Sequence, residues 1–167
     1  MLFFGRILAY AGMLENKEVT WFPSYGAEIR GGTANCTVIV SDELIGSPII
    51  TNPDIFIVMN DASLKKFQPR LKQNGFLIFD SSLIKDPVLR TDIEIVGVPA
   101  TDISGTIGNI KSANMVLLGA LIAKTKLLKE TSAFEALENS MDRRKKGIEI
   151  NKKAIMEGIR FFENKKG

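Results

Sequence analysis

The chain has 167 residues, of which 22 are basic and 19 acidic, so its formal net charge at pH 7 is +3. Hydrophobic residues make up 45% and charged residues 25%, a composition typical of one globular domain with its own core. The basic clusters are short, at residues 143–146 and 165–166, whereas a nucleic-acid-binding protein concentrates basic residues more strongly. The longest apolar run, residues 115–123, is about half the length that spans a membrane. We therefore predict binding to neither nucleic acid nor membrane.

The residue types that are missing exclude several kinds of chemistry. The sequence has no histidine, which is the commonest general base and metal ligand. Its one cysteine, Cys36, allows no internal disulfide, and an iron–sulfur cluster needs about four thiolates. No basic leader of a signal peptide follows Met1. We therefore expect a cytoplasmic protein with no catalytic residue, metal or cofactor of its own.

The first third of the chain predicts a helix followed by two strands. Apolar residues recur at spacings of three and four over residues 2–14, the period of an amphipathic helix. Residues 18–22 form a short candidate strand. Residues 33–40, which are rich in β-branched side chains, form a second one.

The middle of the chain alternates strands with helices. Compact apolar runs at residues 54–59, 76–79 and 93–98 read as strands, and residues 62–71 and 102–107 read as short helices. This alternation predicts an α/β fold with a largely parallel sheet that helices cover on both faces. Unusually for such a fold, the sequence opens on a helix rather than on a strand.

Three further helices are predicted toward the C-terminus, and the last two would form a helical arm over about residues 131–167. Ser132, with Glu135 three residues later, resembles a capping box that would begin the second of these helices. The expected helices cover residues 112–128, 132–141 and 145–162.

The most unusual stretch, WFPSYGAEIRGGTAN, lies between the first two strands at residues 21–35. Its proline fixes φ, and its glycines permit positive φ or the close approach of another chain. The candidate ligand or subunit-interface residues here are Pro23, Ser24, Tyr25, Gly26, Glu28, Arg30, Gly31 and Gly32.

Each of these candidates also has an ordinary structural interpretation. Ser24 and Tyr25 would contact a ligand or partner, or else satisfy backbone groups within a turn. Glu28 and Arg30 would pair across a subunit boundary, or Arg30 would bind a carboxylate or phosphate. Asn60 follows an apolar strand, where α/β sheets place ligand groups, but it could equally cap the next helix.

The sequence resembles the gamma subunits of 2-oxoacid:ferredoxin oxidoreductases, in particular the short gamma chains of the 2-oxoglutarate and branched-chain 2-oxoacid enzymes. The resemblance covers residues 1–167 as one gamma-type domain. It is specific because many short motifs occur together. These are Pro23-Ser24-Tyr25-Gly26, Glu28, Arg30-Gly31-Gly32, Asn35-Cys36, Asn52-Pro53-Asp54, Gly97-Val98-Pro99-Ala100 and Gly108-Asn109.

The resemblance implies a Rossmann-like subunit of a complex that oxidatively decarboxylates a 2-oxoacid to an acyl-CoA and reduces ferredoxin. Alpha and beta subunits, with or without a delta subunit, would carry the thiamine diphosphate, its Mg²⁺ and the iron–sulfur clusters. The gamma chain would act in assembly and on the coenzyme A side of the reaction. We expect such a chain to self-associate when it is isolated.

One departure from the family pattern concerns the start of the fold. Family members carry a strand and a GxGGQG-type loop before the first helix, and this sequence enters that helix directly after Met1. Two alternatives to the subunit interpretation stay open. One is a stand-alone CoA- or nucleotide-binding module, and the other is the related subunit of indolepyruvate oxidoreductase.

Overall fold

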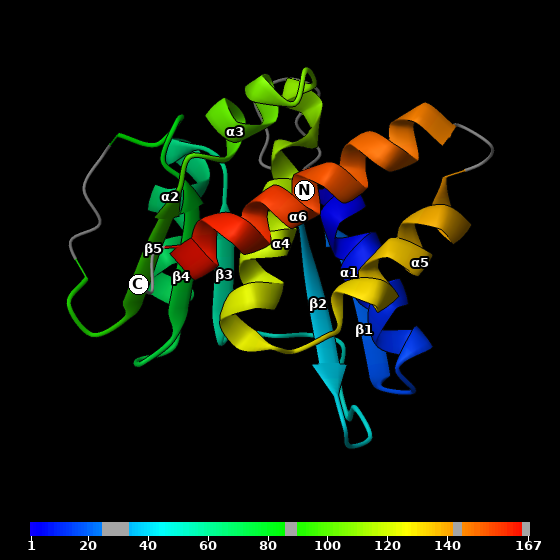
Figure 1. The fold of residues 1–167 in the computed structure, drawn as a ribbon. Helices are drawn as coiled ribbons and strands as arrows, with labels where there is room; N and C mark the ends of the chain where they lie inside the picture. Colours follow the sequence, from blue (N-terminus) through cyan, green and yellow to red (C-terminus); the bar gives the residue numbers. More distant parts are fainter. Residues whose placement is uncertain (25–33, 86–89, 142–144, 165–167) are drawn as a thin grey trace.

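The computed structural model describes residues 1–24, 34–85, 90–141 and 145–164. The chain opens with helix α1 (Leu2–Leu14) and then forms the antiparallel strands β1 (Glu18–Ser24) and β2 (Asn35–Ser41), so that Trp21 lies opposite Val38. Figure 1 shows α1 lying across this strand pair. None of the helices in the part of the chain so described is both long and apolar enough to cross a membrane.

Two glycines let α1 lie directly on the strands. A Cβ atom at Gly5 would stand 2.5 Å from the Cys36 sulfur, and one at Gly12 would stand 2.9 Å from a Val19 methyl carbon. Both distances are shorter than van der Waals contact. The glycines, two turns apart on one face of the helix, therefore set how closely α1 packs.

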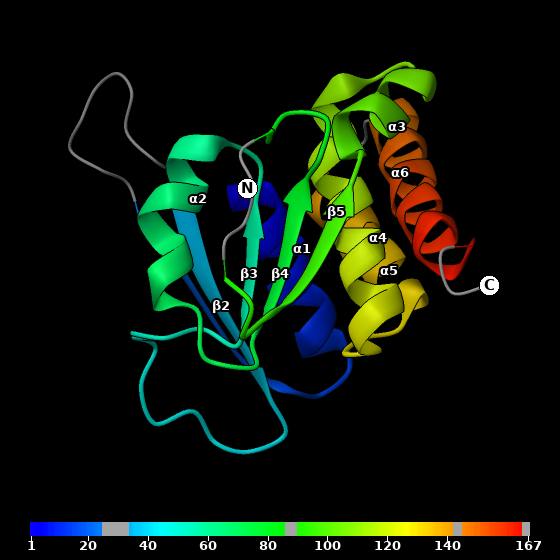
Figure 2. The same ribbon diagram turned by 90° about the vertical axis from the view of Figure 1, so that its left-hand side faces the viewer.

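Three parallel strands form the second sheet, in the order β3 (Ile55–Val58), β4 (Phe76–Asp80) and β5 (Glu94–Val98). Figure 2 shows β2 beside β3. These two strands belong to separate sheets and are not hydrogen-bonded to each other in the part of the structure that is described.

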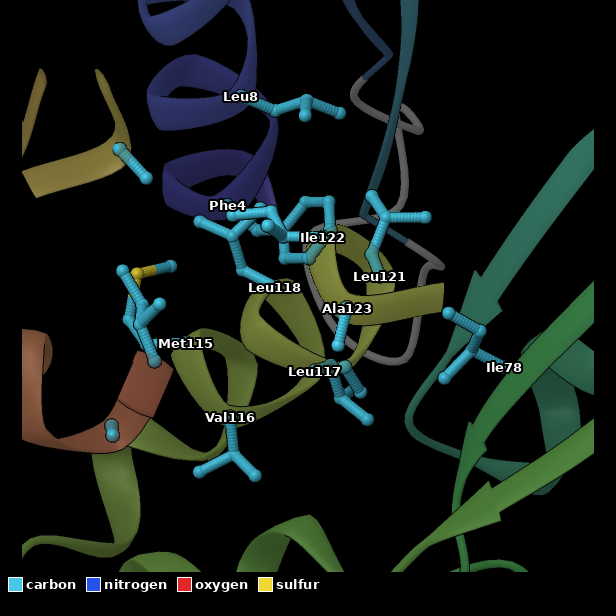
Figure 3. Packing of buried hydrophobic residues seen from close by; sticks show 14 of the residues in the cluster. Phe4, Leu8, Ile78, Met115, Val116, Leu117, Leu118, Leu121, Ile122 and Ala123 are labelled. Carbon is cyan, nitrogen blue, oxygen red and sulfur yellow. The ribbon is translucent and has the colours of Figure 1, made fainter. Parts of the chain in front are cut away.

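Helices cover both faces of the parallel sheet, and the side chains of β4, which alternate between the two faces, contact helices on each side. Leu77 packs with Leu64 of α2 (Asp61–Phe67), which continues as a short 3-10 helix (Gln68–Arg70). Ile78 points the other way, toward α4 (Ala113–Thr125), as Figure 3 shows. The predicted α/β fold with helices on both faces of a largely parallel sheet is confirmed.

The main core is organised around α4. Ten of its residues are buried, and Figure 3 shows Phe4 of α1 beside Leu118 and Ile122, with Leu8 one turn farther along α1. Helix α4 is also covered by α6 (Lys145–Asn164), which follows α5 (Glu130–Ser140) in the chain. The two remaining elements are α3 (Ala100–Thr106) and a 3-10 helix (Ile110–Ser112).

The α4–α6 crossing depends on two glycines, one in each helix, and each glycine faces the backbone of the other helix. A Cβ atom at Gly119 of α4 would collide with the carbonyl oxygen of Ile155, and one at Gly158 of α6 would collide with the carbonyl oxygen of Val116. The two backbones therefore touch, and neither position has room for a side chain.

The predicted elements agree with the structure except at some ends. Helix α5 begins at Glu130 after Lys129, with no side-chain cap, so the predicted capping box is wrong. Ser132 lies inside the first turn and is only 9% exposed. Helix α4 ends at Thr125 rather than at residue 128, because Lys126 adopts the left-handed conformation with φ of 53°.

Candidate functional site at the carboxyl edge of the sheet

Strands β3, β4 and β5 end on the same side of the molecule, which is the edge where open α/β sheets place ligand groups. Polar residues follow each strand there: Asn60 after β3, Asp80 at the end of β4 and Thr101 after β5. Strand β2 runs in the direction opposite to β3, β4 and β5, and β1 runs antiparallel to β2 (Figures 1 and 2). Strand β1 therefore ends, at Ser24, on this same side of the molecule. This edge is the candidate functional site.

Asn60 has the structural role that the sequence left open. It is the N-cap of α2, and its side-chain oxygen accepts a hydrogen bond from the Ser63 backbone N–H at 2.8 Å. Its extended backbone, with φ of −154°, is typical of a capping residue. The cap accounts for the Asn60 oxygen without a ligand.

Asp80 is a buried carboxylate that the sequence did not single out. Its Oδ2 accepts from the Thr101 hydroxyl at 2.6 Å, and its Oδ1 accepts from the backbone N–H groups of Ser82 and Thr101 at 3.1 and 3.3 Å. Both oxygens are used within the fold, so Asp80 ties the end of β4 to the start of α3. The signal in the sequence is an acid placed directly after the apolar run FLIF.

The loops at this edge are joined by further hydrogen bonds. The Ser82 hydroxyl accepts from the Asp102 backbone N–H at 3.1 Å, which joins the segment after β4 to α3, and within α3 the Ser104 hydroxyl donates to the Thr101 carbonyl at 2.9 Å. Polar groups after β4 and β5 thus bind one another. These hydrogen bonds hold the segments after β4 and β5 together at the carboxyl edge.

The predicted stretch around residues 21–35 is only partly described. Pro23 is half-buried and Ser24 is exposed, and both lie at the end of β1 that is on the same side of the molecule as the carboxyl edge. Tyr25, Gly26, Glu28, Arg30, Gly31 and Gly32 lie outside the described residues, so their roles stay predictions.

Cys36 lies on the face of β2 that α1 covers. Burial raises the pKa of its thiol, and this effect outweighs the contact with Trp21, which lowers the pKa. The thiol therefore stays protonated at neutral pH and is a poor nucleophile or metal ligand. Among the residues that the structure describes, no group of three or more His, Cys, Asp or Glu side chains could hold a metal ion.

A groove of about 420 Å³ lies at the opposite end of the molecule, where α4 ends and α5 begins. Its floor is apolar, with Ile122, Leu128 and Ile159, and its rim carries acidic and basic side chains in equal number. None of the site residues predicted from the sequence lines it.

The comparisons with known proteins decide the family. The model for "Pyruvate ferredoxin/flavodoxin oxidoreductase" matches residues 1–161. The chain belongs to this family. It is 33% identical over 159 residues to the ketoisovalerate oxidoreductase subunit VorA of Methanothermobacter marburgensis, covering 95% of this chain and 33% of that one. It is 33% identical over 142 residues to the 2-oxoglutarate synthase subunit KorC of Methanocaldococcus jannaschii, covering 82% of this chain and 75% of that one. The chain thus spans about a third of the length of VorA.

Solved structures agree with the family assignment. A keto/oxoacid ferredoxin oxidoreductase gamma subunit from Geobacter sulfurreducens superposes with a TM-score of 0.82 at 26% identity, covering 98% of this chain and 91% of that one. The 2-oxoglutarate:ferredoxin oxidoreductase of Magnetococcus marinus shares the fold, with a TM-score of 0.87 at 22% identity over 96% of this chain and 28% of that one. The resemblance to gamma subunits of 2-oxoacid:ferredoxin oxidoreductases is therefore confirmed.

Proposed function

We propose that this chain is the gamma subunit of a complex that oxidatively decarboxylates a 2-oxoacid to an acyl-CoA and passes the electrons to a ferredoxin-type acceptor. The supporting observation is the family match over residues 1–161, together with relatives that are named as subunits of such enzymes. The same domain makes up a third of the longer VorA and most of the shorter KorC. A domain that occurs both as part of a longer chain and as a chain of its own is expected to work together with other domains. For this protein those partners would be alpha and beta subunits, with or without a delta subunit.

The chemistry of the complex would lie on those partners. The described residues include no group of three or more His, Cys, Asp or Glu side chains that could hold a metal ion. Within the proposal, this chain contributes a surface, the carboxyl edge together with Ser24 on the same side of the molecule, against which a partner or CoA packs. The M. marinus relative, of the same fold, binds 2-oxoglutarate, coenzyme A and succinyl-CoA, which supports a role on the CoA side of the complex.

Co-expression tests the assembly role. The chain is tagged and expressed with candidate alpha and beta chains, and we expect these to elute with it in fixed ratio. The purified complex should then reduce a ferredoxin-type acceptor only when a 2-oxoacid and CoA are both present. Elution of this chain alone as a well-behaved monomer would contradict the proposal.

A pair of matched variants tests the position of the site. Ser24→Arg places a large cation at the carboxyl edge, and we expect it to weaken co-purification or to raise the KM for CoA. Glu43→Arg introduces the same side chain at an exposed position beyond the other end of β2, and it should change neither. Equal behaviour of the two variants would show that the carboxyl edge is not the functional surface.

Calorimetry separates this proposal from the stand-alone binding module. A module of that kind should give saturable heat with CoA or with nucleotides when no partner is present. A subunit whose CoA contact needs its partners should give none, and saturable heat from the isolated chain would favour the module instead.

A further inference from the structure

The outer edge of β1 lacks a partner strand. Over its seven residues β1 pairs with β2 on one side, and the described part of the chain places no strand on the other side. Its only charged residue is Glu18, and its aromatic side chains are exposed, Trp21 by 37% and Phe22 by 52%. Edge strands of native proteins are usually short or protected by charge or proline, and β1 has Glu18 at its start and Pro23 near its end. Between these two residues the edge is mostly apolar and keeps free main-chain groups with which another strand can pair.

The proline in β1 indicates which backbone groups face outward. Opposite pairs in an antiparallel ladder alternate between hydrogen-bonded and non-hydrogen-bonded. Pro23 has no N–H to give to Cys36, so the pair Pro23–Cys36 belongs to the non-hydrogen-bonded set. Trp21 and Val19 lie two and four residues earlier and share that phase. Their N–H and C=O groups therefore point away from β2.

We propose that β1 of a second copy of this chain pairs antiparallel with this edge, about a two-fold axis at Thr20. In that register Val19 lies opposite Trp21 of the second copy, and the two strands exchange four main-chain hydrogen bonds. Pro23 falls outside these four bonds. Glu18 faces Phe22 of the second copy rather than another acid, so no like charges meet.

Self-complementarity is the reason for choosing a second copy. The four outward groups of Val19 and Trp21 match the same four groups of an identical strand, as an isologous dimer requires. A single strand edge buries less than a standard interface, so the dimer should dissociate on dilution.

Cysteine cross-linking tests the register. In a Cys36→Ala background, Thr20→Cys would place two identical residues on the axis as a non-hydrogen-bonded pair, with Cα atoms about 4.5 Å apart, within the range of a disulfide. Mild oxidation should give a covalent dimer at twice 18.4 kDa on a non-reducing gel. Phe22→Cys is the matched control, because its two copies would be about 13 Å apart along the strands. Cross-linking of both variants alike, or of neither, would overturn the proposal.

Sedimentation tests the edge without new cysteines. The full chain should change from monomer to dimer as its concentration rises. Val19→Pro, which removes an outward N–H as Pro23 does, should stay monomeric with an unchanged circular dichroism spectrum. Phe22→Lys, which adds charge to an exposed position, should weaken the dimer if Val19→Pro fails to fold. A chain that stays monomeric at its highest soluble concentration would refute the edge pairing and leave the proposed subunit function untouched.

Discussion

The α4–α6 crossing and the β1–β2 strand pair are built in opposite ways from similar residue types. Ten residues of α4 are buried, and backbone meets backbone at Gly119 and Gly158. No residue of β1 or β2 is fully buried, although β2 is as rich in β-branched residues as a central strand. Most of the folding stability therefore lies in the helices and the parallel sheet. The strand pair keeps apolar surface that a partner can cover.

The largest effect is expected where the helices cross. In Gly119→Ala the new methyl group meets the carbonyl oxygen of Ile155, and backbone cannot move aside as a side chain can. We expect the free energy of unfolding to fall by about 3 kcal/mol or more, measured by chemical denaturation. Gly105→Ala in α3 is the control, because no atom lies within 4 Å of its new methyl group. It should be neutral or slightly stabilising, and equal losses in the two variants would contradict this account of the crossing.

The next largest effect concerns the frame of the parallel sheet. Asp80→Ala removes three hydrogen bonds and leaves the Thr101 hydroxyl and N–H without their acceptor. We expect a loss of about 2–3 kcal/mol in unfolding free energy. Thr101→Val removes only the hydroxyl bond to the buried Oδ2 and should cost about 1.5–3 kcal/mol, the range for a hydrogen bond to a charged group. A double-mutant cycle should show that the two losses are not additive.

Packing of α1 on the strand pair should be more tolerant. The methyl group of Gly5→Ala would meet the Cys36 sulfur, which is a side-chain atom on an edge sheet. We expect a loss of about 1–2 kcal/mol, smaller than at Gly119. Adding Cys36→Ala should recover part of that loss, because it removes the atom in contact. If Gly5→Ala costs as much as Gly119→Ala, the strand pair is as tightly packed as the helical core.

The same contrast explains what could be predicted from the sequence. Local patterns were enough for α1, whose bounds match the predicted residues 2–14, and for the apolar strands of the parallel sheet. The start of α5 was mispredicted because a distant contact accompanies it: the Lys129 backbone N–H donates to the Glu15 carboxylate at 2.6 Å. Asp80 was missed for a similar reason. Its partner Thr101 is 21 residues away, and an acid after an apolar strand reads as a turn.

The smallest effect should come from the Cys36 thiol. Its pKa is raised in the folded state by burial, so unfolding favours its ionisation. Below the thiol pKa of the unfolded chain this group makes no pH-dependent contribution. As the pH rises above that value, the unfolded state loses protons before the folded state does, and stability falls until the thiol of the folded chain ionises as well. Alkylation of the thiol should accordingly be slower in the folded chain than in urea at the same alkaline pH. Equal rates would show that α1 leaves Cys36 open to solvent, and the strand pair would then be looser than its contacts indicate.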